Sequence, residues 1–67
     1  MKFHPFNLRR RYAAYLYRKK VYNAVIQNTE AYIANKPNDI FMLELRARAF
    51  TSLRDWEKGL IWYKKVF

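Results

Sequence analysis

Basic residues and tyrosines near the N-terminus are the side chains of this sequence best suited to bind a charged ligand. The basic residues form two clusters, and the tyrosines lie between and just after them: Arg9, Arg10, Arg11, Arg18, Lys19 and Lys20, with Tyr12, Tyr15, Tyr17 and Tyr22. Arginine and lysine neutralise phosphates, and tyrosine rings stack on bases. The segment therefore suits a nucleic acid. Its basic ends around an aromatic centre also suit an anionic membrane surface.

The positive charge is concentrated in the first part of the chain. The 67 residues include 14 basic and 5 acidic ones, a formal net charge of +9. Residues 1–29 contain seven basic residues and no acidic one, whereas residues 30–67 contain seven basic residues and all five acidic ones. A one-sided positive field favours an acidic partner, which can be nucleic acid, an anionic membrane or an acidic protein surface.

Residues that could catalyse a reaction or hold a metal are scarce. The chain has no cysteine, and His4 is its one histidine, so cysteine nucleophiles and sites of cysteine or clustered histidine ligands are excluded. Asp55 and Glu57 stand at a helix start, where acidic side chains satisfy free N–H groups. Gly59 is the one glycine, so no glycine-rich loop can cradle a phosphate. We therefore expect no enzyme, and no catalytic residue, metal or cofactor.

Turn residues are too few for a sheet of short strands, because the chain has one glycine and two prolines. We expect an all-α fold with an internal turn at Pro37. Helix starts are predicted at Asn7, Asp39 and Asp55, whose side chains can accept hydrogen bonds from free N–H groups. The predicted helices are residues 7–19, 22–35, 40–53 and 56–67.

Apolar residues recur at helical spacing in these segments and predict the core. The third predicted helix has one apolar stripe and the fourth has another: Ile40, Leu43, Ala47 and Phe50, then Trp56, Leu60, Tyr63 and Phe67. Tyr12 and Tyr22 are expected in the core of a helix pair. Each apolar face is wide, so each helix must pack against more than one neighbour.

The sequence repeats itself after 34 residues. A shift of that length aligns four pairs of similar side chains: Ala13 with Ala47, Leu16 with Phe50, Tyr22 with Trp56 and Ile26 with Leu60. This period, the two small residues, the aromatic that opens each second helix and Pro37 at the end of the first unit resemble the tetratricopeptide repeat family. The chain departs from the family pattern at several positions, among them Arg46, where the family prefers leucine.

The resemblance implies antiparallel helix-turn-helix pairs stacked as a short right-handed superhelical solenoid. The N-terminal segment would be residues 1–5, the first unit residues 6–39, and the second unit residues 40–67, incomplete at its end. We expect a fragment of a longer repeat protein, or an end face near Trp62, Val66 and Phe67 that further repeats, a partner or a second copy covers.

In this family the first helices of successive units line a concave groove. The resemblance places the following residues on the groove: Asn7, Arg10, Ala14, Tyr17, Arg18, Phe41, Glu44 and Arg48. Arg10, Arg18 and Arg48 could form paired hydrogen bonds with carboxylates, while Glu44 and Arg48 also predict a surface ion pair. The alternative is that these residues belong to an ordinary solvated helix face.

Three functions follow from these features. The first is a protein-interaction scaffold that presents the basic groove to an acidic peptide or partner subunit. The second is a nucleic-acid-binding part of a ribonucleoprotein, and the third is attachment to an anionic membrane surface. No apolar run is long enough to cross a membrane and the N-terminus is a poor secretory signal, so we expect the cytoplasm, with the mitochondrial matrix as the alternative.

Overall fold

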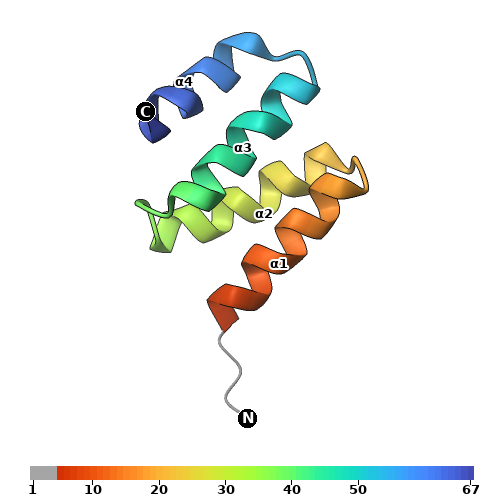
Figure 1. Cartoon of the computed structure of the whole chain (residues 1–67), viewed down its shortest axis with the longest axis vertical. Helices are drawn as coiled ribbons and strands as arrows, with labels where there is room; N and C mark the ends of the chain where they lie inside the picture. Colours follow the sequence, from red (N-terminus) through yellow and green to blue (C-terminus); the bar gives the residue numbers. More distant parts are fainter. Residues whose placement is uncertain (1–4) are drawn as a thin grey trace.

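The computed structural model describes the backbone of residues 5–67 and the side chains from Leu8 onward. The described residues form four α-helices and no strand: α1 (Pro5–Arg18), α2 (Tyr22–Asn35), α3 (Ile40–Ser52) and α4 (Trp56–Val66). The chain reverses direction after each helix, and each helix packs against the next one (Figure 1). In addition α3 packs against α1, whereas α4 packs against α3 alone. The all-helical prediction is confirmed.

All helix boundaries agree with the predicted ones within two residues, and the largest difference is at the predicted start, Asn7. Helix α1 begins at Pro5. A proline suits the first helical position, because an N–H there would have no partner inside the helix. The side chain of Asn7 and the remainder of the predicted N-terminal segment lie outside the described part of the chain.

The two predicted N-caps at Asp39 and Asp55 are confirmed. The Asp39 carboxylate accepts a hydrogen bond from the N–H of Met42 at 3.3 Å, and the Asp55 carboxylate accepts one from the N–H of Lys58 at 3.2 Å. Each bond satisfies an N–H that the first helical turn leaves unpaired. These caps define the starts of α3 and α4.

The turns after α1 and α3 have the same hydrogen bonds. The N–H of Lys20 bonds to the carbonyl of Tyr17 and that of Val21 to the carbonyl of Leu16, both at 2.9 Å. After α3 the equivalent bonds, also 2.9 Å, join residue 54 to 51 and residue 55 to 50. Lys20 and Arg54, 34 residues apart, both have a φ near +63°. This is the Schellman ending of a helix, in which a left-handed residue turns the chain away.

The core lies between α1, α2 and α3. Its buried residues form one cluster: Ala13, Leu16, Val25, Tyr32, Met42, Leu45 and Ala49. Ala13 and Ala47 are fully buried, so side chains are small where helices approach closely. Tyr22 is partly buried against the cluster, but Tyr12 is 53% exposed, so the prediction that Tyr12 lies in the core is wrong. The buried side of α1 includes Ala13, Leu16 and Tyr17, and Tyr12 points away from it.

Candidate binding groove between α1 and α3

The predicted groove residues whose side chains the structure describes lie on α1 and α3, and a hollow opens between the middle of α1 and the N-terminal end of α3. The hollow has a volume of about 360 Å³ and is lined by Arg10, Arg11, Ala14 and Phe41. Phe41 and Arg48 are exposed on α3, and Glu44 between them is partly buried. Spacings of three and four residues place these three side chains on one face of the helix.

Arg10 is held against α3 by two contacts. Its Nε atom lies 3.4 Å from Oδ2 of Asp39, and its guanidinium lies 5.1 Å from the centroid of the Phe41 ring. The first contact is an ion pair without a hydrogen bond from Nε. The second is a cation–π contact. One wall of the hollow is therefore positively charged and positioned before any ligand arrives.

The Asp39 carboxylate connects three helices at this end of the groove. One oxygen caps α3 and the other accepts a hydrogen bond from the Tyr32 hydroxyl of α2 at 2.5 Å and attracts Arg10 of α1. Burial raises the pKa of Tyr32, and the hydrogen bond to Asp39 raises it further. This carboxylate therefore positions the N-terminal end of α3 relative to α1.

The other end of the groove contains an internal ion pair. Nη2 of Arg48 lies 2.7 Å from Oε1 of Glu44, which confirms the predicted pair. The hydrogen bond to Glu44 raises the pKa of Arg48, and the charge of Glu44 adds to the effect.

Tyr17, also predicted for the groove, packs edge-on against Tyr22 with ring centroids 5.7 Å apart, so its ring contributes to the fold. Arg18 is exposed. A ligand at this end must compete with Glu44 for Arg48.

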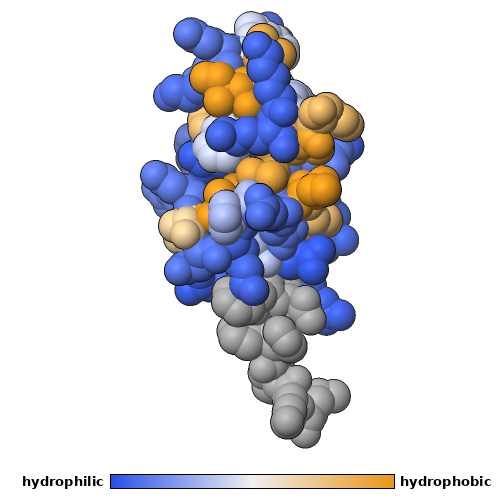
Figure 2. Space-filling model, turned by 90° about the vertical axis from the view of Figure 1, so that its left-hand side faces the viewer, coloured by the Kyte–Doolittle hydropathy of each residue, from blue (hydrophilic) through white to orange (hydrophobic). Residues whose placement is uncertain are grey.

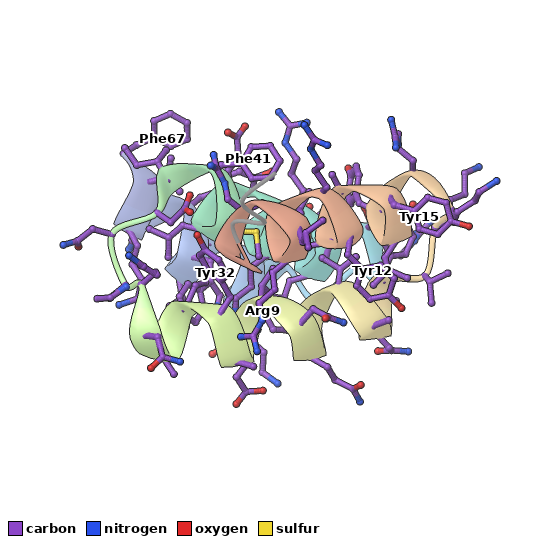
Figure 3. All side chains as sticks on the ribbon, turned by 90° about the horizontal axis from the view of Figure 1, so that it is seen from below. Arg9, Tyr12, Tyr15, Tyr32, Phe41 and Phe67 are labelled. Carbon is purple, nitrogen blue, oxygen red and sulfur yellow. The ribbon has the colours of Figure 1, made fainter. Side chains whose placement is uncertain are left out.

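Consecutive arginines of α1 point to different sides of the helix, because each residue turns by about 100°. Arg10 and Arg11 line the hollow beside α3, whereas Arg9 lines a separate hollow with Gln27, Asn28 and Ala31 of α2. Arg9 and Phe41 lie on opposite sides of α1 (Figure 3). Arg18, Lys19 and Lys20 are exposed at the far end of α1. The structure therefore does not gather the six basic residues into one patch.

The outward side of α1 carries two exposed tyrosines. The rings of Tyr12 and Tyr15 stack with centroids 6.5 Å apart and an angle of 16° between their planes. The ammonium group of Lys19 lies 5.8 Å from the centroid of Tyr15. Figure 3 shows both tyrosines near the end of α1. This surface is distinct from the groove.

Arg11 and Arg46 are two residues whose positions the sequence analysis missed. Arg11 shares a helical stripe with Asn7, Ala14 and Arg18, and this spacing would have added it to the groove. Arg46 is 7% exposed, and its Nη1 donates hydrogen bonds to the carbonyl of Ile26 at 2.5 Å and to Oγ1 of Thr29 at 3.2 Å. The family's preference for leucine at this position was a signal that Arg46 is buried, but its hydrogen-bond partners on α2 depend on how the helices pack.

Of the three residues predicted for the end face, Phe67 is the one that is strongly exposed. Trp62 and Val66 are partly buried, and the Arg46 guanidinium lies against the Trp62 ring. A hollow of about 480 Å³ separates the end of α4 from the turn between α2 and α3, with this lining: Pro37, Asn38, Ile40, Leu43, Lys65 and Val66. Figure 2 shows this side of the molecule, where hydrophobic patches lie among hydrophilic side chains.

Within residues 5–67 the structure offers neither a metal site nor a membrane span. No three or more histidine, cysteine or acidic residues of this part of the chain are grouped so that they could hold a metal ion. None of its helices is both long and apolar enough to cross a bilayer. The chain matches no protein-family model, no curated protein and no solved structure.

Proposed function

We propose that this chain is a tetratricopeptide-like module that binds an acidic segment of a partner protein in the groove between α1 and α3. The observation that carries the proposal is the hollow lined by Arg10, Arg11, Ala14 and Phe41. Guanidinium groups form paired hydrogen bonds with carboxylates, and an aromatic ring beside them accommodates an apolar side chain. A peptide with alternating acidic and apolar residues suits this lining.

The repeated helix endings support the repeat arrangement. The turns at Lys20 and Arg54 share one hydrogen-bonding pattern 34 residues apart, and Ala13 and Ala47 are both fully buried. The packing of α3 against both α1 and α2 is the neighbour relationship that stacked helix pairs require. In such a stack α1 and α3 line the same side of the module.

Arg11 is the groove arginine best placed to bind a carboxylate. It is exposed and has no ion pair within the described residues, whereas Arg10 lies beside Asp39 and Arg48 is paired with Glu44. Arg10 adds positive charge in a position that Asp39 and Phe41 restrict, and such preorganisation lowers the entropy lost on binding. We therefore expect affinity to depend most on Arg11.

The test is fluorescence anisotropy with a labelled peptide of alternating glutamate and leucine, and with a glutamine-for-glutamate version. We expect the acidic peptide to bind more tightly, and Arg11→Glu to weaken its binding by about tenfold, equivalent to about 1.4 kcal/mol. Arg9→Glu is the matched control, because it changes the net charge equally on the other side of α1. If both variants lose the same affinity, the peptide is attracted only by the net charge of the chain and does not bind in the groove.

The stacked Tyr12–Tyr15 pair favours a second candidate, binding of single-stranded nucleic acid along α1. Both rings are about half exposed, and Lys19 is a nearby cation that could contact a phosphate. Binding of a labelled mixed-sequence RNA should fall with rising salt and should weaken in the Tyr12→Ala/Tyr15→Ala double variant. RNA affinity that is the same for this variant and the unchanged chain would remove this candidate.

A further inference from the structure

Helix α4 has an apolar face that nothing covers among the described residues. Trp56, Leu60 and Phe67 are 64%, 56% and 92% exposed. They share one stripe of the helix, because at 100° per residue their directions fall within about 40° of one another. Helix α4 lies at one edge of the molecule with α3 on its inner side (Figure 1).

The internal repeat allows the burial of this stripe to be compared with that of the equivalent residues in α2. The residues 34 positions earlier are Tyr22, Ile26 and Ile33 of α2, and all three are partly buried against the core. The exposure differs because α3 covers α2, whereas no helix of residues 5–67 covers the outer side of α4. The α4 stripe is thus a surface suited to a packed helix.

Two charges along the edge of this stripe indicate which helix fits it. Glu57 and Lys64 are seven residues apart, so their side chains lie about 20° from each other on the same edge. They stand near opposite ends of α4. In an antiparallel, two-fold symmetric pair of α4 helices centred near Leu60, Glu57 of each copy lies opposite Lys64 of the other. The same alignment brings Trp56 near Phe67 of the second copy.

The charge distribution favours contact between copies at this end. The segment from Asp55 to Phe67 contains three lysines and two acidic residues, whereas residues 1–29 contain seven basic residues without an acidic one. Two copies that meet through α4 keep their strongly basic α1 helices apart and limit the repulsion between them. A second copy is therefore favoured over a strongly charged partner.

We infer that the Trp56–Leu60–Phe67 face of α4 binds the same face of a second copy, antiparallel, with two Glu57–Lys64 ion pairs between the copies. This self-association is separate from peptide binding in the groove. One helix per copy buries less than the roughly 1,200 Å² of stable complexes, so the dimer is weak and reversible. The apolar stripe gives it affinity, and the ion pairs give it direction and register.

Sedimentation equilibrium of the full chain tests the inference over concentrations of about 10 µM to 1 mM. We expect a monomer–dimer equilibrium that Leu60→Glu abolishes. Glu57→Lys and Lys64→Glu should each weaken dimerisation by about tenfold. The double variant E57K/K64E restores the opposite charges, so its dimerisation constant should lie within about threefold of that of the original chain. Lys19→Glu, which makes the same charge change as Lys64→Glu but on the α1 side of the molecule, should leave the dimer intact.

Circular dichroism would confirm that each variant remains helical. A monomer throughout the concentration range overturns the inference, as does a dimer that persists in folded Leu60→Glu. A dimer that is lost in both single charge variants but not recovered in the double variant overturns the antiparallel register.

Discussion

The guanidinium of Arg46 lies 4.7 Å from the centroid of the Trp62 ring, so a buried cation of α3 packs against an aromatic ring of α4. The same group donates hydrogen bonds to Ile26 and Thr29 of α2. It therefore connects α2 and α4, two of the described helices that do not pack against each other. Burial lowers the pKa of Arg46, while the charge of Glu30 acts in the opposite direction.

Substitutions at Arg46 should separate packing from charge. Arg46→Ala leaves a void beneath Trp62 and should lower the free energy of unfolding by about 2–3 kcal/mol. Arg46→Leu fills most of that space and removes a buried cation whose Nε has no hydrogen bond, so it should remain within about 1 kcal/mol of the original chain. Urea unfolding followed by circular dichroism measures both. If leucine is as destabilising as alanine, the hydrogen bonds of the guanidinium outweigh its packing.

Asp39 should contribute more to stability than Asp55, although both cap a helix. Asp39 also accepts a hydrogen bond from Tyr32 and attracts Arg10, whereas Asp55 has an exposed ion pair with Lys58. We expect Asp39→Ala to cost about 2–3 kcal/mol and Asp55→Ala about 1 kcal/mol. The two variants carry the same charge change, so thermal unfolding in one buffer compares them directly. Equal costs would show that only the caps contribute.

The Tyr32–Asp39 bond should make stability depend on pH in the alkaline range. The pKa of Tyr32 is raised in the folded chain above its ordinary value near 10. The folded state therefore holds this proton more tightly than the unfolded state, and its contribution is complete below pH 10 and declines as pH rises through the folded pKa. As pH rises above about 10, the unfolding free energy should fall more steeply for the original chain than for Tyr32→Phe. Parallel curves would contradict this linkage.

Gly59 should tolerate alanine only if Thr51 changes as well. A β-carbon at Gly59 would lie 2.5 Å from Cγ2 of Thr51, because α4 approaches α3 closely there. Gly59→Ala should cost about 1–3 kcal/mol even though alanine favours helices. Thr51→Ser removes Cγ2 and keeps the hydroxyl that donates to the carbonyl of Arg48. The Thr51→Ser/Gly59→Ala variant should recover most of the loss in a double-mutant cycle, and simple additivity would rule out this clash.

The helices were predictable because their signals are local. Helical spacing, a proline turn and the caps Asp39 and Asp55 predicted four helices, and α2 has the predicted bounds. The groove residues Arg10, Ala14 and Phe41 were predicted from the family resemblance, and the structure places them around one hollow.

The errors concern features that depend on how helices pack. Tyr12 was expected in the core, but α2 and α3 cover the Ala13 side of α1 and leave Tyr12 exposed. The threefold role of Asp39 and the burial of Arg46 likewise depend on residues from other helices. Spacing along one helix indicates which residues share a face but does not indicate which face a neighbour covers.

Packing of each helix mainly against its neighbour in sequence also affects how the chain folds. Most contacts form between segments close together along the chain, so little loop-closure entropy is lost before they form, and we expect rapid folding. Because α4 packs against α3 alone among the described helices, it can detach while the other three helices remain together. Its amide hydrogens should therefore exchange with solvent sooner than those of the central helix α3.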